Sequence, residues 1–391
     1  MLISRGLKKS IQRELDSFYK EVVGTDFNIR EASKSAFTQA RANLKYEAFV
    51  ELNDNVNQTF YTEAPYLVWH HMRLLSADGS RLVLPKHPSV IEEFGEHGFG
   101  PKAKSQRSLA VCSILYDCIN LLTIDAQIGP YGTGERDLLY KHLEKVKKGD
   151  LLLLDRGYPS TALFFLLNEK GIEFCVRMQS DWWLAIKEFK ESGEKQRIIT
   201  LGYPTKDNEI LQNYPHLIDK EIQIRLVRAD LDNGETEILC TSLLDKKKYT
   251  YADLVELYHY RWNIEEGYKL YKARVELENF SGKTALAVKQ DFFAKVFIMS
   301  LCAILAFPIE ERVKKESGVV FQKHPQKINR TNALSMLQNI TIGLFIKRSF
   351  QLAIKAFDIV VRNTREIVRP GRKNERMQRP KKLYYMNYKA L

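Results

Sequence analysis

Three acidic residues, Asp78, Asp155 and Glu265, lie far apart in the sequence within short motifs whose residue types suit catalysis. The motifs read "SADGSRLVLP", "LLLLDRGYPS" and "YHYRWNIEEGYKLYK". Carboxylates from separate elements are typical ligands of Mg²⁺ or Mn²⁺, because hard cations prefer oxygen. Two such ions, roughly 4 Å apart, activate a water or a 3′ hydroxyl and stabilise the leaving oxygen of an in-line phosphoryl displacement. The three acids therefore predict metal-dependent phosphoryl transfer.

Each aspartate also has an ordinary structural interpretation. Asp155 follows four leucines, and at a strand end it either binds a cation or accepts backbone N–H groups of the next helix. Asp78 precedes Gly79 between two apolar runs, where Asp-Gly commonly forms a hairpin turn. Taken alone, neither residue distinguishes the two interpretations, so the expected sheet has to decide between them.

The Glu265 motif predicts an amphipathic helix. At about 100° per residue, one narrow face of a single helix carries Tyr258, Arg261, Glu265 and Lys272. An apolar stripe runs beside that face and consists of Leu257, Ile264, Tyr268 and Tyr271. If this stripe packs on a sheet, the polar face points at the sheet edge and Glu265 completes a carboxylate triad. The alternative is a solvated helix on which Arg261 and Glu265 form an i,i+4 pair, worth roughly 0.2–0.5 kcal/mol.

The elements that must position these acids follow the order strand, strand, strand, helix, strand, helix, strand. Strand patterns cover residues 72–85 and 108–129, followed by a helix at 134–149, a strand at 150–155, a helix at 160–171 and a strand at 172–178. This order predicts an α/β fold with a ribonuclease H-like mixed sheet flanked by helices. In that sheet the first strand lies beside the fourth, which brings Asp78 close to Asp155.

Five segments are expected along the chain. Residues 1–65 form an N-terminal helical DNA-binding domain, although an ordinary amphipathic helix explains residues 33–49 equally well. Residues 66–180 and 250–345 form two parts of a catalytic core. A β-rich insertion, residues 181–249, separates them and contains a hairpin that turns at Asp232-Asn233-Gly234. Residues 346–391 form a basic C-terminal segment.

The charge of the chain, +12 at pH 7, indicates an anionic partner, either nucleic acid or an acidic membrane surface. Residues 365–391 carry nine Lys or Arg and two Glu, which suits either binding of flanking DNA or a solvated tail. Five cysteines without a Cys-x-x-Cys pair argue against a disulfide framework and a zinc ribbon. We expect a soluble cytoplasmic protein, because no signal-peptide pattern is present and the most apolar run, 296–307, is shorter than a membrane span.

Together the three motifs resemble those of bacterial insertion-sequence transposases with a DDE catalytic triad, specifically insertion-sequence family four. The matching residues are Asp78-Gly79-Ser80, Asp155-Arg156-Gly157-Tyr158, and Tyr258, Arg261, Glu265 and Lys272 at that family's Tyr-x2-Arg-x3-Glu-x6-Lys spacing. The resemblance covers the chain from about Asp78 to Lys272, including the insertion. It implies Asp78, Asp155 and Glu265 as catalytic ligands of Mg²⁺ or Mn²⁺. It also implies Tyr258, Arg261 and Lys272 as contacts to phosphates at the transposon end.

The function that this resemblance implies is cut-and-paste transposition. The protein would bind the double-stranded DNA ends of its insertion sequence, cleave them and transfer the strands to a target, working as a homodimer because two ends must be held together. In relatives a tryptophan of the insertion supports a flipped base while a hairpin forms, and this chain offers Trp182 and Trp183, for which core packing is the alternative. Two other functions stay open: a catalytically silent DNA-binding regulator, and a metal-dependent DNA endonuclease without strand transfer.

Overall fold

The computed structural model describes residue 3 and residues 9–99, 105–179, 183–203, 211–230, 234–319 and 324–368. The strands are β1 Leu74–Val83, β2 Glu96–Phe99, β3 Ser105–Asp117, β4 Leu122–Pro130, β5 Leu151–Leu154, β6 Glu173–Met178, β7 Gln196–Gly202, β8 Glu221–Asp230, β9 Thr236–Thr241, β10 Gln326–Ile328 and β11 Arg365–Ile367. The helices are α1 Ile11–Val23, α2 Lys34–Ala42, α3 Glu47–Glu63, α4 Pro88–Phe94, α5 Glu135–His142, α6 Thr161–Glu169, α7 Leu184–Ser192, α8 Tyr251–His259, α9 Trp262–Ala273, α10 Ala285–Val319, α11 Arg330–Phe345 and α12 Phe350–Asn363.

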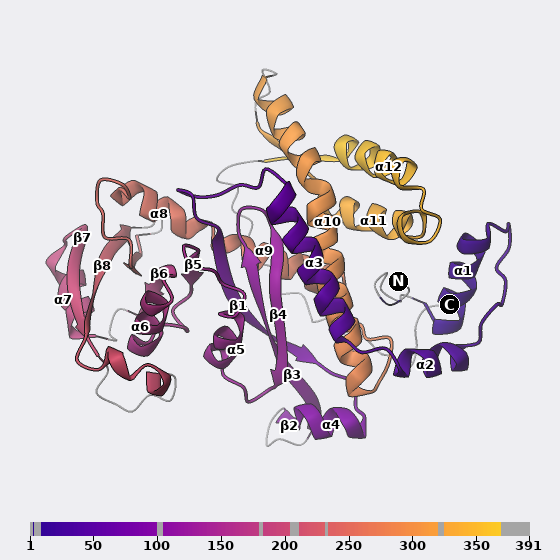
Figure 1. Ribbon diagram of the computed structural model, residues 1–391, viewed down its shortest axis with the longest axis horizontal. Coiled ribbons are helices and arrows are strands. Elements are labelled where there is room, and N and C mark those ends of the chain that lie inside the picture. The colour runs from indigo at the N-terminus through magenta and orange to yellow at the C-terminus, as the bar shows by residue number, and fades with distance from the viewer. Residues whose placement is uncertain are drawn as a thin grey trace.

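A mixed sheet of nine strands organises the molecule (Figure 1). Its strand order is β2-β3-β1-β5-β6-β9-β8-β7, with β4 paired to β3. Strand β1 is antiparallel to β3 and parallel to β5, and β5 is parallel to β6. The expected neighbourhood of the first strand and the strand that ends in Asp155 is therefore confirmed.

The four leucines of β5 explain why this strand is so apolar. Leu151 and Leu153 belong to one buried cluster, with side chains of α8, α9 and α10. Leu152 and Leu154 belong to a second cluster on the other face, with side chains of α5, α6 and α7. Side chains alternate between the two faces of a strand, and β5 is covered by helices on both faces, so every position must be apolar.

The longest helix, α10, crosses the core beside α3 (Figure 1). Its Ala285–Gly318 stretch is long and apolar enough to cross a membrane by length and composition, but 78% of its most apolar window is buried inside the protein, as in a core helix. Both helices are fixed to the same carbonyl of β4: Asn57 Nδ2 donates to Thr123 O at 2.8 Å, and Ser300 Oγ donates to it at 3.1 Å. Helix α3, which falls within the expected segment 1–65, thus packs on the sheet domain.

A buried arginine fastens α2 to α10. Arg41 donates to Asp291 Oδ1 at 2.8 Å and to Ala287 O at 2.9 Å, and its Nε donates to Gln290 Oε1. Because an unpaired buried charge is costly, this set of partners fixes how α2 sits on the core. Helices α1 and α2 lie at the end of the molecule opposite to α7, β7 and β8 (Figure 1).

The insertion after β6 continues the same sheet through β9, β8 and β7. The expected hairpin is confirmed, since β8 and β9 pair antiparallel up to Asp230 and Thr236, and Gly234 adopts the left-handed φ of 83°. Trp183 packs edge-to-face on Phe164 with ring centroids 6.0 Å apart, in keeping with core packing. Trp182 and the basic residues beyond 368 lie outside the described residues.

Candidate active site

Asp78 and Asp155 occupy equivalent places on neighbouring parallel strands. The pairing of β1 with β5 aligns Leu74 with Leu151 and Ser76 with Leu153. Two residues further along each strand stand Asp78 and Asp155, at an edge where adjacent strands are about 4.7–4.9 Å apart. The alternative interpretation of Asp78 as a hairpin-turn residue is wrong, because β1 runs without a turn from Leu74 to Val83.

The negative charges of the Asp78 and Asp155 carboxylates are only partly balanced by hydrogen bonds and nearby positive charge. Burial raises the pKa of Asp78 to about 6, although the Gly79 N–H donates to its Oδ1 at 2.8 Å and the Arg261 charge also lowers the pKa. The charges of Glu135 and Glu265 add to the rise in the pKa of Asp78. Asp155 Oδ1 is buried and has no hydrogen-bond partner among the described residues. Both side chains have the unmet negative charge that a bound cation neutralises.

Two tyrosines fasten α8 and α9 to the strand ends that carry the aspartates. The hydroxyl of Tyr268 on α9 donates to the Asp78 carbonyl at 2.7 Å. The hydroxyl of Tyr258 on α8 donates to the carbonyl of Leu154, the residue before Asp155, at 3.3 Å. Glu265 lies three residues before Tyr268, one turn away on the same helix. The turn of α9 that carries Glu265 thus adjoins the turn fastened to β1.

Glu265 is paired with Arg261. Arg261 Nη2 donates to Glu265 Oε1 at 2.8 Å, and the arginine side chain is only 6% exposed. Burial opposes the charge on Arg261, but the phenol of Tyr258 and the hydrogen bond to Glu265 outweigh it and raise the arginine pKa. Asp155 acts on Arg261 in the same direction. One guanidinium therefore balances charge for all three acids, since it also acts on Asp78.

The expectation that the Glu265 motif, from Tyr258 to Lys272, lies on a single helix is wrong. The chain forms α8 and α9, separated at Tyr260 and Arg261, where backbone hydrogen bonds span three residues: Arg261 N donates to Tyr258 O and Ile264 N to Arg261 O, both at 3.2 Å. Such tighter turns change how far the side chains of α9 are rotated about the helix axis relative to those of α8. A uniform rotation of about 100° per residue therefore does not describe the whole motif. Tyr258 is buried at 5% exposure with its hydroxyl engaged, whereas Lys272 is exposed.

The four residues of the Glu265 motif therefore do not share one face toward solvent. Lys272 and Arg81 line a cavity of about 520 Å³ beside Gly79 and Ser80, next to Asp78. Positive charge at that place suits an incoming phosphate group. Tyr258 instead supports the backbone behind Asp155.

The residues fit a divalent cation by the type of their donors and by their charge. They offer carboxylate oxygens, one of them an unpartnered buried atom. Within the described part of the chain, however, no group of three or more His, Cys, Asp or Glu side chains already lies close enough to hold an ion. Glu265 binds Arg261 instead of joining the aspartates.

A buried Asp–His–Ser chain, not expected from the sequence, supports the site from below. His142 Nδ1 lies 2.7 Å from Asp125 Oδ2, and His142 Nε2 lies 3.0 Å from Ser113 Oγ. Ser113 Oγ in turn donates to the Asp78 carbonyl at 3.3 Å. His142 and Ser113 are fully buried, so they hold the backbone of Asp78 and do not serve as a hydrolytic triad. The sequence held one sign of this chain of hydrogen bonds: His142 lies on the apolar face of its helix, beside Leu138 and Leu139.

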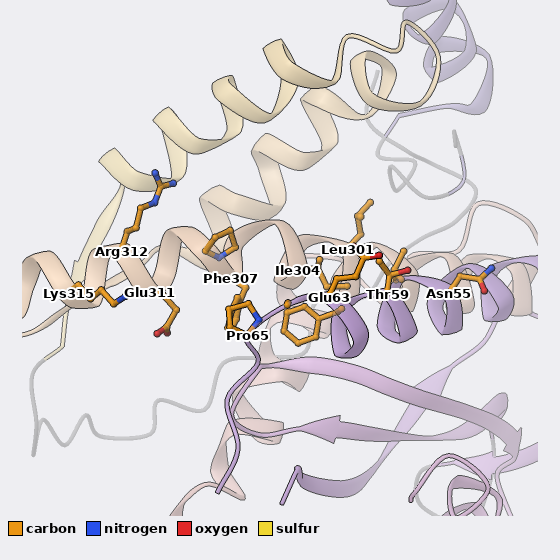
Figure 2. A pocket seen from close by; sticks show the side chains of 14 residues that line it. Asn55, Thr59, Glu63, Pro65, Leu301, Ile304, Phe307, Glu311, Arg312 and Lys315 are labelled. Atoms are coloured by element: carbon orange, nitrogen blue, oxygen red, sulfur yellow. The ribbon is translucent and has the colours of Figure 1, made fainter. Parts of the chain in front are cut away.

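A larger cavity of about 810 Å³ lies between α3 and α10 (Figure 2). Its lining includes Phe60, Ile304 and Phe307, and it shares no residue with the acidic site. Figure 2 shows Phe307 and Pro65 on the same stretch of the cavity, with Glu311 and Lys315 further along α10. The chemistry expected from the acids does not take place in this apolar cavity.

Comparisons with known proteins agree on one kind of protein. The family described as "Transposase DDE domain" matches residues 69–302, a span that contains all three acids. The chain is 23% identical to transposase InsG for insertion sequence element IS4 of Escherichia coli (strain K12) over 284 residues, 72% of this chain and 62% of that protein. It is 19% identical to the transposase for insertion sequence element IS231B of Bacillus thuringiensis subsp. berliner over 359 residues, 79% of this chain and 70% of that protein.

The chain thus spans less than two thirds of the InsG transposase. Among solved structures, it is similar to a piggyBac transposase synaptic complex with hairpin DNA, determined by cryo-EM, with a TM-score of 0.43 and 12% identity. That alignment covers 84% of this chain and 66% of the other. A similarity of that size is too low to establish a common fold.

Proposed function

The chain belongs to the transposase DDE domain family, and from that premise we propose that it binds the DNA ends of an insertion sequence and carries out metal-dependent strand cleavage and strand transfer. The observation that carries the proposal is the alignment of Asp78 with Asp155 on parallel strands, with the helix of Glu265 fastened to the Asp78 carbonyl. Carboxylates gathered from separate elements at one sheet edge are what metal-assisted phosphoryl transfer requires.

The strand order supports a ribonuclease H-like core. The run β4-β3-β1-β5-β6 has three antiparallel strands followed by parallel pairing of β1, β5 and β6. The insertion, residues 181–249, lies between the second aspartate and Glu265, and β9 joins it to the core sheet. Residues 66–180 and 250–345 would then be the two parts of one catalytic domain.

Asp78, Asp155 and Glu265 are the proposed catalytic residues and ligands of Mg²⁺ or Mn²⁺. When bound, the cation neutralises the acids, lowers the pKa of the attacking water or hydroxyl and stabilises the leaving oxygen. Tyr268 and Ser113 hold the Asp78 backbone, and Tyr258 holds the backbone before Asp155. By fixing the backbone, these contacts keep the carboxylate oxygens of Asp78 and Asp155 in position for the substrate.

The basic residues of the site have a different role. Arg261 now neutralises Glu265, and its guanidinium has the geometry to grip a phosphate with two N–H groups. Lys272 is exposed beside Asp78 and supplies a point charge. We assign Lys272 to a phosphate of the transposon end, and Arg261, which is buried and paired with Glu265, to a second phosphate that it would reach once that pair opens. The buried hydroxyl of Tyr258 favours support of the site over contact with DNA.

The partner is double-stranded DNA, in keeping with the charge of +12. Two transposon ends must be held together, so a homodimer is the proposed form on DNA, in the cytoplasm where the element lies. The N-terminal residues and the basic segment 346–391 are the proposed sites of further DNA binding.

The test is a transposition reaction in vitro. The purified protein is incubated in Mg²⁺ with linear DNA that carries the inverted repeats flanking its gene, together with a target plasmid. A transposase cuts at the repeats and joins the released ends to the plasmid. Cleavage without joining would identify an endonuclease, and binding without cleavage would identify a silent regulator. Equal activity of Asp155→Asn and Glu265→Gln proteins would disprove the assigned site.

A further inference from the structure

A fourth carboxylate, Glu135, lies beside the two aspartates. It begins α5, which follows β4. A Cβ added to Gly79 would stand 2.8 Å from Glu135 Oε1, and a Cβ added to Gly157 would stand 3.7 Å from Glu135 Oε2. Gly79 directly follows Asp78, and Gly157 stands two residues after Asp155. The carboxylate of Glu135 therefore occupies the space between the two aspartate motifs.

The Glu135 side chain fills the space that a side chain at Gly79 would need, whereas its contact at Gly157 is an ordinary one. Neither Gly79 nor Gly157 has a positive φ, so backbone conformation does not require glycine there. A Cβ at Gly79 would come too close to the Glu135 carboxylate, which, as the far end of a flexible side chain, would have to move. Any other residue at position 79 would push the Glu135 carboxylate away.

An ordinary capping role does not account for Glu135. Asp137 already serves the start of α5, since its Oδ2 accepts the N–H of Gly134 at 3.1 Å. Glu135 itself gains only the modest attraction of a first-turn acid to the helix dipole. Its negative charge acts on a neighbouring acid instead, because it adds to the rise in the pKa of Asp78.

A buried hydroxyl facing the acids is an independent sign of a ligand. Tyr158 is 1% exposed, and its hydroxyl has no hydrogen-bond partner among the described residues. Burial raises the pKa of Tyr158, and the charges of Glu135, Asp78 and Asp155 raise it further, whereas the nearby Ser113 hydroxyl opposes the rise without reaching hydrogen-bond geometry. An unpartnered hydroxyl and the unpartnered Oδ1 of Asp155 thus adjoin the same acids. Buried polar groups in folded proteins nearly always have a partner.

We propose that Glu135 is a fourth carboxylate of the metal centre, which holds a divalent cation together with Asp78 and Asp155. This inference rests on the proposed function and adds a ligand to it. Within the described part of the chain no three acids are yet close enough to hold an ion, as expected where neighbouring carboxylates repel one another. Arg261 pairs with Glu265, and Arg81 and Lys272 line the cavity that Glu135 also lines, so these basic residues offset only part of the charge of the four carboxylates. A divalent cation would neutralise the remainder.

The experiment is a titration of the full-length protein with Mn²⁺ alone, followed by the EPR signal of free Mn²⁺ at pH 7.5. The variants are Glu135→Gln, Gly79→Ala and Asp155→Asn, with Glu144→Gln as the matched control, because Glu144 is an exposed glutamate just beyond α5. We expect Glu135→Gln to lose one bound ion or to bind on the order of tenfold more weakly or worse, since even supporting partners of ligands contribute about that much. Glu144→Gln should bind like the parent.

Gly79→Ala provides the second test, because it displaces the Glu135 side chain without removing any acid. It should weaken Mn²⁺ binding as Glu135→Gln does, and the double variant should bind no worse than either single variant. If Glu135→Gln binds as many ions as tightly as Glu144→Gln does, Glu135 is not a ligand and the inference fails. Loss of binding in Asp155→Asn would then leave the proposed function standing, whereas parental binding in Asp155→Asn would remove the proposed active site itself.

Discussion

The two ends of the β1–β5 strand pair differ in whether their buried charged residues form ion pairs. Before β1 and β5 stand Arg73 and Asp150, which form a buried ion pair. Arg73 Nε donates to Asp150 Oδ1 at 2.8 Å, and Asp150 Oδ2 also accepts the Lys147 N–H at 2.7 Å. Further along the same pair stand Asp78, within β1, and Asp155, directly after β5, and among the described residues neither forms an ion pair. The fold can neutralise an acid at this depth, yet among the described residues it gives Asp78 and Asp155 no ion-pair partner.

This contrast separates a structural end from a functional end. A compensated buried pair is costly to break, because the remaining partner stays buried and charged. An uncompensated acid is costly to keep, and proteins accept such local cost mainly where chemistry needs it. Substitutions at the two ends should therefore affect different quantities.

The largest expected effect is on catalysis at the functional end. Asp155→Ala should lower strand cleavage in Mg²⁺ by on the order of a thousandfold or more, because it removes a proposed ligand of the catalytic cation. Urea unfolding should show no loss of stability, since Asp155 Oδ1 has no described partner to lose. A stable variant that retains more than a tenth of parental cleavage would contradict the assignment.

The matched substitution at the structural end should affect stability. Asp150→Ala leaves Arg73 buried without its partner and should lower the free energy of unfolding by about 3–5 kcal/mol. Urea denaturation followed by circular dichroism measures this loss, and cleavage by the folded fraction should persist. If Asp150→Ala lowers the free energy of unfolding by less than about 1 kcal/mol, the Arg73–Asp150 pair does not have the structural role assigned to it.

Asp78→Asn should stabilise the protein while it abolishes cleavage. The pKa of Asp78 is about 6 in the folded protein, above its ordinary value of 3.8, so the folded state binds the proton more tightly. The stability contribution of this carboxyl therefore falls as the pH rises from about 4 to 6 and stays low above that range. At pH 7.5 the asparagine should raise the free energy of unfolding by about 1–3 kcal/mol.

The check on Asp78→Asn is a pair of unfolding curves at pH 4 and pH 7.5. The variant and the parent should differ little at pH 4, which is close to the ordinary pKa of 3.8 and well below the folded value of about 6, and should differ much more at pH 7.5. A variant that is less stable than the parent at pH 7.5 would show that the Asp78 charge is compensated after all.

The smallest expected effect concerns the tyrosine supports. Tyr268→Phe removes a 2.7 Å hydrogen bond to the Asp78 carbonyl and should cost about 0.5–1.5 kcal/mol of stability. Tyr258→Phe removes a longer bond of 3.3 Å to the Leu154 carbonyl and should cost less. Cleavage rates measured beside unfolding should fall more for Tyr268→Phe, because that bond connects the helix of Glu265 to Asp78. If Tyr268→Phe and Tyr258→Phe lower the cleavage rate equally, the bond from Tyr268 is not the more important support.

The sequence predicted the pairing of the strands that carry Asp78 and Asp155 better than it predicted helices α8 and α9. Four consecutive leucines and the order of the elements were enough to pair β1 with β5 and so to align Asp78 with Asp155, because a strand buried on both faces has a strong apolar pattern. The break between α8 and α9 was not predicted, because the sequence pattern across Tyr260 and Arg261 continues a helix, and the contacts of the two helices, such as those of Tyr258 and Tyr268 to carbonyls of distant strands, appear only in the fold.

Two further contributions to the site were also missed for physical reasons. An acid in the first turn of a helix is commonplace, so Glu135 gave no signal until its distance from Gly79 was known. Arg73 and Asp150 are 77 positions apart, and their pairing follows only from the register of the two strands. The roles proposed for Arg261 and Lys272 on DNA stay predictions.

The most direct test of the central claim is anomalous scattering from Mn²⁺ in crystals of the full-length protein. The account predicts an anomalous peak in direct contact with carboxylate oxygens of both Asp78 and Asp155, at the end of β1 and β5. Bound Mn²⁺ elsewhere, with both carboxylates free of it and Glu265 still paired with Arg261, would contradict the account.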